Sequence, residues 1–443
     1  MTYSDSIQFL YRLQMFGAKL GLETPRHLAA LAGNPERQLR FIHVAGTNGK
    51  GSTCAMLESI YRAAGWRVGL FTSPHLLSFT ERLQINRRPI PPDTVARLMT
   101  ELHRLLDELP GAQHATFFEV VTVLALRYFA EERCDLVIWE TGLGGRLDAT
   151  NIVTPLASAI TEIAYDHQQW LGSTLDQIAA EKAGIIKPGV PVVTSAQPGQ
   201  GLEVIAETAR QQGAPLTVVQ DCARLSALLD SSSSLALAGL HQKKNAALAL
   251  AVTDVLAGLL PVNEQACREG LSRVSWPGRF QIVPRMGGRT VVLDGAHNLA
   301  GATALHAAWT EAYPGIQPAL VLGFLADKDW AGMARKLAPL ANRILLVPVH
   351  SARALAPREL MAVCQEAHPG ARIDVCGSVR EALQLGAEEP WLLVAGSLYL
   401  IGETMEELGV GVGAGAEAAE SVRLLNERGL NEWSKAEAYG SLG

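Results

Sequence analysis

Short apolar runs alternate with longer stretches of helical periodicity along most of the chain. FIHVA at 41–45 precedes a helix predicted over 52–64, and the apolar run WRVGLF at 66–71 follows it. A strand, a helix and a second strand in this order form a βαβ unit, the building block of a parallel sheet covered on both faces. Further strands are predicted at 135–140, 156–163 and 191–195, and helical stretches at 94–109 and 117–132. The pattern predicts a doubly wound α/β domain.

A second series of predicted strands follows the Trp-, Pro- and Gly-containing segment SWPGRF at 275–280. These strands are RTVVLDG, PALVLGF, NRILLVPV, RIDVCG and WLLVAGS. We therefore place a larger domain at 1–275 and a smaller, Rossmann-like α/β domain at 276–408. The glycine-rich and then polar stretch 409–443 has no strong apolar periodicity, so we expect a flexible tail there.

Composition narrows the class of protein. The chain has 443 residues, 48% hydrophobic and 19% charged, which is an ordinary globular balance with room for more than one core. A net charge of -6 gives no long-range attraction for nucleic acid or an acidic membrane surface. No apolar run is long enough to span a bilayer, the N-terminus lacks a signal-peptide pattern, and the six cysteines show no CxxC spacing. We expect a cytoplasmic monomer that acts on small molecules.

The segment HVAGTNGKGST at 43–53 is the first candidate for a binding site. Backbone N–H groups at a helix N-terminus bind phosphate well when glycines let the ligand approach, and a lysine can neutralise the terminal phosphates. The match to G-x-x-x-x-G-K-[ST] is a variant, because Val44 replaces the first glycine and Gly51 separates Lys50 from Ser52. A glycine-rich turn with a capping serine is the structural alternative. The residues predicted to bind the phosphates of ATP are Gly46, Thr47, Asn48, Gly49, Lys50, Gly51 and Ser52.

Polar residues also follow three other predicted strands. Ser73 follows the strand that ends at Phe71, Glu140 ends the next strand, and His167 follows the strand at 156–163. Because open parallel sheets place their sites at the carboxyl ends of the strands, these side chains are expected to converge on one edge. A hydroxyl, a carboxylate and an imidazole could hold Mg²⁺ together with phosphate oxygens. Taken singly, each could instead be a turn residue, a helix-end carboxylate or a satisfied polar group.

A resemblance then emerges from motifs in order over about residues 5–408. They are HVAGTNGKGS, LFTSPHLLSFTERL, FFEVVTVLA, ETGLGGRLDATN, DHQQWLGSTLDQIAAEKAGIIKPG, HQKKNAALAL, WPGRF, LDGAHN, LADKDW and AGSLYL. Together they resemble the folylpolyglutamate synthases and dihydrofolate synthases of the Mur ligase superfamily. The resemblance implies an ATP-dependent ligase in which ATP converts a folate or dihydropteroate carboxylate into an acyl phosphate. The amino group of L-glutamate then attacks, giving an amide, ADP and phosphate.

The resemblance also implies roles for individual residues. Lys50, Lys182, His167 and Arg279 would serve catalysis, and Ser73, Glu140, His167 and a carbamylated Lys182 would hold Mg²⁺. The nucleotide would meet Asn245, Arg279 and Asp294, and Arg279 could reach the phosphates only when the domains close. The incoming glutamate would meet His297, Ser397 and the N-terminus of the helix after GSLYL, and the pterin would meet Phe118 and Arg146.

For three of these residues a purely structural role remains an alternative. Lys182 could be a solvated charge or an ion-pair partner on a helix, Phe118 could be a core aromatic, and His297 could cap a helix. The chain also departs from the family pattern at Leu299 after DGAHN, at EIAY before DHQ and at GLETP. None of these departures removes a residue assigned to ATP or magnesium.

The same residues argue against two other classes of protein and leave two alternatives. Only about 42 residues precede His43, which leaves no room for the extra N-terminal domain of a peptidoglycan ligase. A dinucleotide oxidoreductase would need G-x-G-x-x-G, whereas this loop supplies a lysine. A non-catalytic ATP-binding regulator, or a Mur-type ligase for another carboxylate acceptor, stays as an alternative. The sequence does not decide between dihydrofolate synthase, folylpolyglutamate synthase and both.

Overall fold

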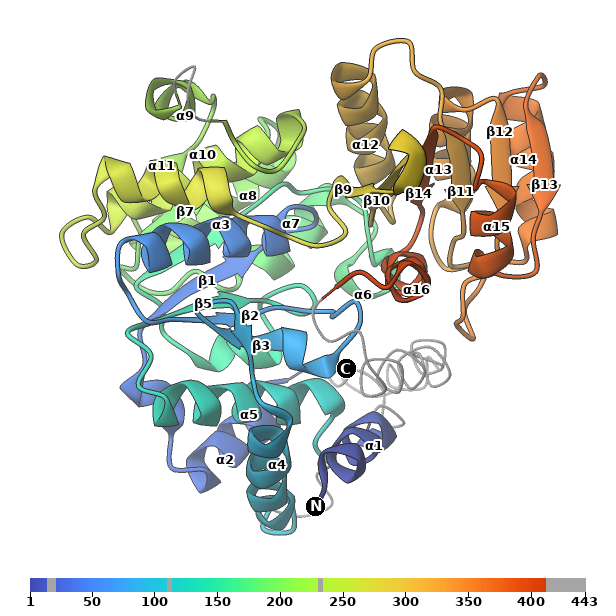
Figure 1. The fold of residues 1–443 in the computed structure, drawn as a ribbon. Coiled ribbons are helices and arrows are strands. Elements are labelled where there is room, and N and C mark those ends of the chain that lie inside the picture. The colour runs from blue at the N-terminus through green and yellow to red at the C-terminus, as the bar shows by residue number, and fades with distance from the viewer. Residues whose placement is uncertain (14–20, 110–113, 230–233, 412–443) are drawn as a thin grey trace.

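The computed structural model of the chain describes residues 1–13, 21–109, 114–229 and 234–411. It has two α/β parts, each built on its own sheet, as the sequence predicts (Figure 1). The predicted tail at 409–443 lies outside the described residues from 412 onward. Along the described ranges no helix combines the length and apolar character needed to cross a membrane.

The larger part contains an eight-stranded sheet in the order β4-β3-β2-β5-β1-β6-β7-β8. The strands in chain order are β1 (Phe41–Ala45), β2 (Val68–Phe71), β3 (Leu83–Ile85), β4 (Arg88–Pro89), β5 (Leu136–Glu140), β6 (Ala157–Ile160), β7 (Val192–Thr194) and β8 (Leu216–Val218). All pairs from β2 to β8 are parallel, and β3 and β4 add an antiparallel extension at one edge. The sequence pattern did not predict this extension, because runs of two or three residues carry no periodicity.

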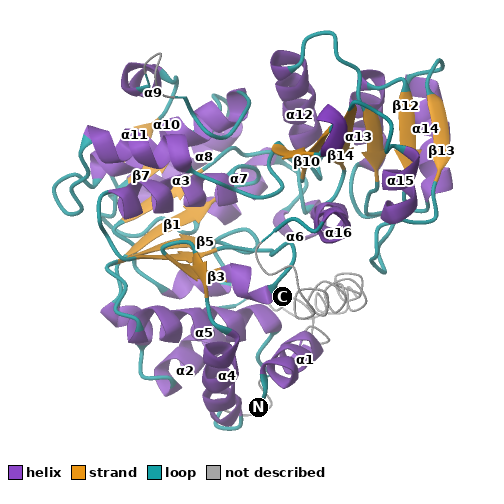
Figure 2. Cartoon of the chain, viewed as in Figure 1, coloured by secondary structure: helices purple, strands orange, loops and turns teal. Residues whose placement is uncertain are grey.

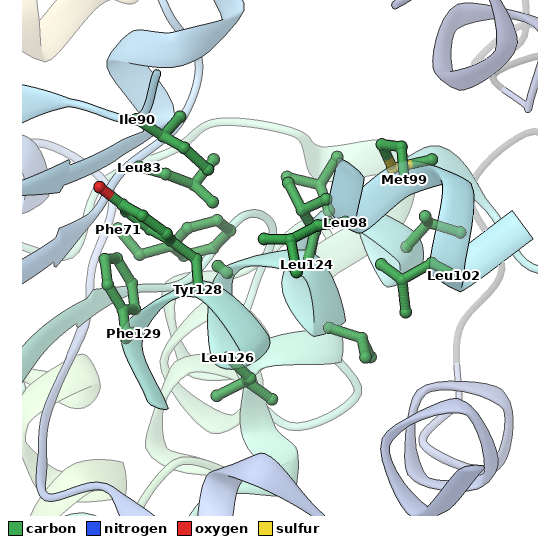
Figure 3. Close-up of a cluster of buried hydrophobic side chains, with 14 of the residues drawn as sticks. Phe71, Leu83, Ile90, Leu98, Met99, Leu102, Leu124, Leu126, Tyr128 and Phe129 are labelled. Carbon is green, nitrogen blue, oxygen red and sulfur yellow. The ribbon is translucent and has the colours of Figure 1, made fainter. Parts of the chain in front are cut away.

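Helices cover both faces of this sheet (Figure 2). In chain order they are α1 (Tyr3–Leu13), α2 (Glu23–Leu31), α3 (Lys50–Ala63), α4 (Pro92–Leu106), α5 (Phe117–Glu131), α6 (Gln168–Leu171), α7 (Leu175–Ala183), α8 (Gln200–Gln211), α9 (Ala223–Leu228), α10 (Leu240–Val255) and α11 (Glu264–Arg273). Successive residues of a strand point to opposite faces of the sheet. Ile42 therefore packs with α3 and α10, while Phe41 packs in the core beside α5. Figure 3 shows part of that second core, in which Phe71, Phe129 and Leu124 pack together.

The smaller part contains a six-stranded sheet in the order β13-β12-β11-β14-β10-β9. Its strands are β9 (Gln281–Pro284), β10 (Thr290–Asp294), β11 (Ala319–Leu322), β12 (Arg343–Leu346), β13 (Arg372–Val375) and β14 (Trp391–Ala395), and its helices are α12 (Leu299–Ala312), α13 (Trp330–Leu337), α14 (Pro357–Ala367), α15 (Val379–Leu385) and α16 (Leu398–Leu408). Only β9 is antiparallel to its neighbour. The two parts meet where Leu77 of the first enters the apolar cluster of Leu400 and Ile401 on α16.

Candidate active site

The phosphate loop joins the end of β1 to the start of α3. Gly46 and Gly49 have φ angles of +147° and +88°, which side chains with a Cβ atom rarely adopt. A Cβ atom on Gly46 would lie 1.7 Å from Oγ1 of Thr161, and one on Gly49 would lie 2.4 Å from Oδ1 of Asn245. Backbone geometry and space therefore both require glycine at these two positions.

Side chains pin this loop on both sides. Oγ1 of Thr47 donates to the carbonyl of Ala164 and accepts from its N–H, each at 3.1 Å. Asn48 exchanges amide hydrogen bonds with Asn298 of the second part, at 2.9 and 3.2 Å. A Cβ atom on Gly51 would lie 2.9 Å from Nε1 of Trp276, and Ser52 is buried in the first turn of α3. The loop is thus fixed before any nucleotide arrives.

Lys50 is the first residue of α3. Its Nζ donates to the carbonyl oxygens of Gly46 at 3.2 Å and Thr47 at 3.3 Å, so the side chain folds back over the loop. None of the ion pairs within the described ranges includes it. Its positive charge is therefore available to an anion bound on the loop.

Glu140 ends β5, next to β1, and is buried. One carboxylate oxygen accepts from the backbone N–H of Ser73 at 3.0 Å. Burial raises the pKa of Glu140 to about 7, although Lys50, the Ser73 N–H and Arg279 oppose this rise. A carboxylate so poorly compensated is the kind of group that a cation would stabilise.

Lys182 lies near the end of α7 and is 3% exposed. Its Nζ donates to the carbonyl of Gly46 at 2.8 Å. Burial lowers the pKa of Lys182 to about 7, and the positive charge of Lys50 lowers it further. The alternative that Lys182 is a solvated charge is wrong, because the side chain is buried and bonded to the phosphate loop.

His167 follows β6 and has a left-handed backbone, with φ of +50°. Its Nε2 lies 3.4 Å from Nζ of Lys328 and 3.8 Å from Oδ1 of Asp166. Burial is the main cause that lowers the pKa of His167, so the ring is neutral at pH 7. A neutral imidazole is the form that can coordinate a metal ion.

Asp166 is one of the points where the two parts of the chain meet. Its Oδ1 accepts from Nζ of Lys328 at 2.6 Å, and its Oδ2 accepts from Nδ2 of Asn298 at 3.1 Å. Nε2 of His297 lies 3.7 Å from the same Oδ2. The Asp166 and Lys328 side chains are 7% and 10% exposed, so this is a buried ion pair between the two parts.

Three predicted nucleotide residues face this region from the linker, α10 and β10. Arg279 lines a pocket with Gly51, Ser73 and Glu140, and its charge acts on Glu140. Asp294 ends β10 and accepts from the N–H groups of Phe280 and Ala296, each at 2.9 Å. Asn245 lies against Gly49, as the space requirement of that glycine shows, and donates to Gln242. The structure brings Arg279 and Asn245 to the phosphate loop, while backbone hydrogen bonds already occupy Asp294.

The two predicted glutamate residues lie in different settings. Nδ1 of His297 contacts the carbonyl of Gly295 at 2.8 Å, and burial lowers the pKa of His297 to about 4. Ser397 is 1% exposed and caps α16 by accepting from the N–H of Tyr399 at 3.2 Å. The expected helix after GSLYL is α16 itself, which begins inside that motif at Leu398. The prediction of a later helix start is wrong, because Ser397 is the N-cap.

The two predicted pterin residues lie on α5 and in the loop that follows β5. Phe118 is half-buried in the first turn of α5, 6.0 Å from the ring of Phe71 and directly beneath Gly142. Arg146 pairs with Glu181 at 2.7 Å and is 58% exposed. Glu181 already takes Nε and Nη2 of Arg146, so an arriving carboxylate would share the guanidinium with it or replace it.

The side chains at this edge could supply a few of the ligands of a hard cation, while water and phosphate oxygens would supply the rest. Among the described residues, no three His, Cys, Asp or Glu side chains gather closely enough to hold a metal ion by themselves. Glu140 supplies a buried carboxylate at the end of β5, Ser73 follows the adjacent strand β2, and His167 follows β6 on the far side of β1. Mg²⁺ that keeps water and phosphate oxygens as ligands matches such a sparse set.

Sequence reasoning missed the ion pair of Asp166 with Lys328. Asp166 stands after a strand beside His167, and Lys328 lies in the LADKDW motif, but neither residue received a role. The only available signal was their position after predicted strands. The two residues are 162 positions apart in the sequence, so their contact cannot be inferred until the two sheets are placed.

Fold and site together define the class of protein, an ATP-dependent ligase built from two α/β domains. Residues 44–253 match the Mur ligase middle domain, and residues 278–398 match the Mur ligase glutamate ligase domain. A dihydrofolate synthase/folylpolyglutamate synthase of Bacillus subtilis is 33% identical over 427 residues, covering 92% of this chain and 99% of that protein. The chain belongs to the dihydrofolate synthase and folylpolyglutamate synthase family of Mur ligases.

Solved structures agree with this assignment. The Mycobacterium tuberculosis folylpolyglutamate synthase complexed with ADP has a TM-score of 0.82 at 29% identity and covers 92% of this chain and 99% of its own. An Escherichia coli FolC structure in complex with DHPP and ADP has a TM-score of 0.80 at 31% identity, with 92% and 98% covered. The fold predicted from the motifs is therefore confirmed.

Proposed function

We propose that this chain forms an amide between a carboxylate of dihydropteroate or a folate and the amino group of L-glutamate, at the expense of ATP. The observation that carries the proposal is one sheet edge where Lys50, Glu140 and the buried Lys182 surround the phosphate loop, with Arg279, His297 and Lys328 facing it from the second part. The relatives' names supply the acceptor and donor.

The first step joins the acceptor carboxylate to phosphate. A carboxylate oxygen attacks the γ-phosphorus of ATP, the bond to the β–γ bridging oxygen breaks, and ADP leaves with that electron pair. Lys50 neutralises charge on the phosphates, and Arg279 adds a second positive charge when the two parts close. Bound Mg²⁺, held by Ser73, Glu140, His167 and phosphate oxygens, would screen the charges that repel the two anions.

The second step makes the amide. The neutral amine of glutamate attacks the acyl carbon, the carbon–oxygen bond to phosphate breaks, and the amine nitrogen loses a proton. His297 and Lys328 face this point from the second part, where cationic or polar side chains suit the carboxylates of the incoming amino acid. Ser397, the N-cap of α16, would add a hydroxyl. Phe118 offers a ring face for a flat pterin.

Lys182 has a further property that fits the carbamate expected from the resemblance. Its burial and its pKa of about 7 leave part of the amine neutral at pH 7. A neutral amine is the form that reacts with carbon dioxide, and the resulting anion would lie beside the carbonyl of Gly46 on the phosphate loop. We include carbamylation of Lys182 in the proposal.

We also propose that the protein is a cytoplasmic monomer. Its six free cysteines suit a reducing compartment.

Purified protein tests the proposal directly. ATP, Mg²⁺ and L-glutamate are supplied with either dihydropteroate or tetrahydrofolate, and phosphate release is measured with the product mass. Glutamate-dependent phosphate release and the addition of one glutamate are expected with at least one acceptor, and both activities would mean a bifunctional enzyme. A Lys50→Ala variant prepared in parallel excludes a contaminating ligase. Protein that binds ATP but modifies neither acceptor would contradict the proposal.

A further inference from the structure

Arg82 is a buried cation outside the machinery described above. It ends the short helix η3 (Phe79–Arg82) beside β3 and is only 5% exposed. No ion pair within the described ranges includes Arg82, in contrast to Arg127, whose guanidinium meets Glu101 and Glu131. Its neighbour Glu81 acts on it through charge alone, while the Glu81 carboxylate accepts its hydrogen bonds from the N–H groups of Leu76, Leu77 and Ser78.

Three side chains without a formal charge surround the guanidinium or its partner, namely His75, Tyr11 and Phe117. Nε of Arg82 donates to Nδ1 of His75 at 2.8 Å, and Nε2 of His75 lies 3.3 Å from the hydroxyl of Tyr11. The guanidinium carbon lies 5.2 Å from the centre of the Phe117 ring. These contacts fix one nitrogen and one face of the group, and among the described residues the two terminal nitrogens have no hydrogen-bond acceptor.

Arg82 also lies beside the candidate active site. Its carbonyl accepts from the N–H of Thr72, the residue before Ser73, so its backbone is one residue away from a candidate magnesium ligand. Its charge acts on Glu140, and Tyr399 of α16 in the second part is close enough to influence Arg82 in turn. Arg82 thus lies where the two parts of the chain meet, next to the reacting groups.

Burial of an unpaired charge is costly, and proteins normally supply a partner. Cation–π contact with Phe117 offsets part of this cost, but a ring does not satisfy the terminal N–H groups. A carboxylate does, because its two oxygens match the planar fork of a guanidinium. The environment of Arg82 therefore lacks one component, an anion with carboxylate geometry.

We propose that Arg82 binds a carboxylate of the acceptor substrate, namely the α-carboxylate of an acceptor that already carries glutamate. The inference rests on the proposed function and deepens it. Dihydropteroate has one carboxylate, which must react. A glutamylated folate has a second carboxylate on the same glutamate, and that group needs a partner when the other one is phosphorylated.

The position of Arg82 suits this assignment. Phe117, which lies under the guanidinium, is the neighbour in sequence of Phe118, the candidate pterin contact. The charge of Arg82 also acts on Glu140, at the candidate phosphorylation site, and its carbonyl accepts from the N–H of Thr72 beside Ser73. Arg82 is therefore near both the segment of the candidate pterin contact and the candidate phosphorylation site, as a partner of the extra glutamate of a folate would have to be. It would be a residue that favours glutamylated acceptors.

The test compares two acceptors in four proteins. The values of kcat/KM for dihydropteroate and tetrahydrofolate are measured in the wild type, Arg82→Lys, Arg82→Met and the control Arg127→Gln, with thermal unfolding as a check of folding. In Arg82→Met the ratio of tetrahydrofolate to dihydropteroate activity should fall on the order of 10- to 100-fold, the worth of one charged hydrogen-bonded contact. Arg82→Lys, which keeps the charge and should fold, should show a smaller fall. Arg127→Gln should keep the wild-type ratio.

Equal losses with both acceptors would mean that Arg82 only supports the fold, and would overturn the inference. A rise in KM for L-glutamate with dihydropteroate as acceptor would also overturn it, since the bound carboxylate would then belong to the amino donor.

Equilibrium binding separates this inference from the proposed function. Titration of pteroate and pteroylglutamate into wild type and Arg82→Lys needs no turnover. The inference predicts tighter binding of pteroylglutamate by the wild type and a weaker preference in the variant, whose ammonium keeps the charge but not the planar fork. Equal affinity of the wild type for both would refute the Arg82 site, whereas absence of turnover by wild type that shows the preference would refute only the proposed reaction.

Discussion

The two sheets contribute to the site in different ways. At the first sheet, neighbouring residues in the sequence build the phosphate loop, and backbone geometry dictates their identity, as the φ angles of Gly46 and Gly49 show. At the second sheet, His297 and Lys328 lie against Asp166 of the first part, and Lys328 also lies against His167. The first edge is a local structure, and the second becomes a site only when the two parts meet.

This difference separates two kinds of contribution. Groups on the first edge should affect binding and phosphoryl transfer whatever the position of the second part. Groups on the second edge should affect mainly the steps that need closure. Substitutions on the two edges can therefore be compared by their separate effects on ADP binding and on turnover.

The largest effect is expected at the first edge. Lys50→Ala removes the cation that folds over the phosphate loop, and turnover should fall on the order of 1,000-fold. Steady-state phosphate release measures this loss, and ADP titration should show weaker binding as well. Turnover within a factor of a few of the wild type would show that the loop does not hold the transferred phosphate.

Lys182→Ala should lower turnover about 100-fold, by removing the anion that its carbamate would supply near the phosphates. Added short-chain carboxylates such as acetate should restore part of the activity, because they can occupy the vacated space with the same charge. Lys187→Ala, at a lysine whose Nζ instead contacts the carbonyl of Asn151, is the control and should show no such rescue. Full activity of Lys182→Ala without added anions would refute the role.

Asp166→Asn tests the connection between the edges. It leaves Lys328 buried without its partner, so kcat should fall on the order of 10- to 100-fold while ADP binding changes little. The surface pair of Arg380 with Glu407 offers a matched control, since Arg380→Gln should leave both thermal stability and turnover close to those of the wild type. An equal loss of ADP affinity in Asp166→Asn would mean that this ion pair belongs to the nucleotide site.

The smallest expected effect lies in the core under the first edge and depends on pH. Burial lowers the pKa of His43 to about 3, and its Nε2 lies 2.9 Å from Oγ1 of Thr150. A histidine with a lowered folded-state pKa stabilises the fold above its unfolded pKa of roughly 6.5, and this contribution is lost as pH falls toward 3. Between pH 7.5 and 5, wild type should lose about 2 kcal/mol more than His43→Gln in urea unfolding. If the unfolding free energy changes equally with pH in the two proteins, His43 is not the group whose titration destabilises the fold.

Much of the first part could be predicted because its signals are local. Apolar periodicity indicated β1, α3 and β5 to within a few residues, and the order of glycines and Lys50 indicated the phosphate loop. The carboxyl-end rule then placed Glu140 and Ser73 at one edge, where they share a hydrogen bond. Each of these inferences needed only residues close in sequence or neighbouring strands.

The rest depends on contacts that sequence spacing does not encode. The antiparallel strands β3 and β4 are too short for a periodic signal, yet they position Arg82. The burial of Lys182 follows from the packing of α7 against the loop, while its spacing in the helix suggested a surface charge. Asp166 and Lys328 require the relative placement of two sheets. Long-range charge pairing is the part of this site that a single sequence concealed.

One measurement tests the central claim, that a carboxylate is activated by phosphorylation, most directly. The acceptor carboxylate is labelled with ¹⁸O, the protein is given ATP, Mg²⁺ and L-glutamate, and the released phosphate is analysed by mass spectrometry. The account predicts that each phosphate released with amide formation carries one oxygen from the acceptor carboxylate. Amide formation with unlabelled phosphate would contradict it.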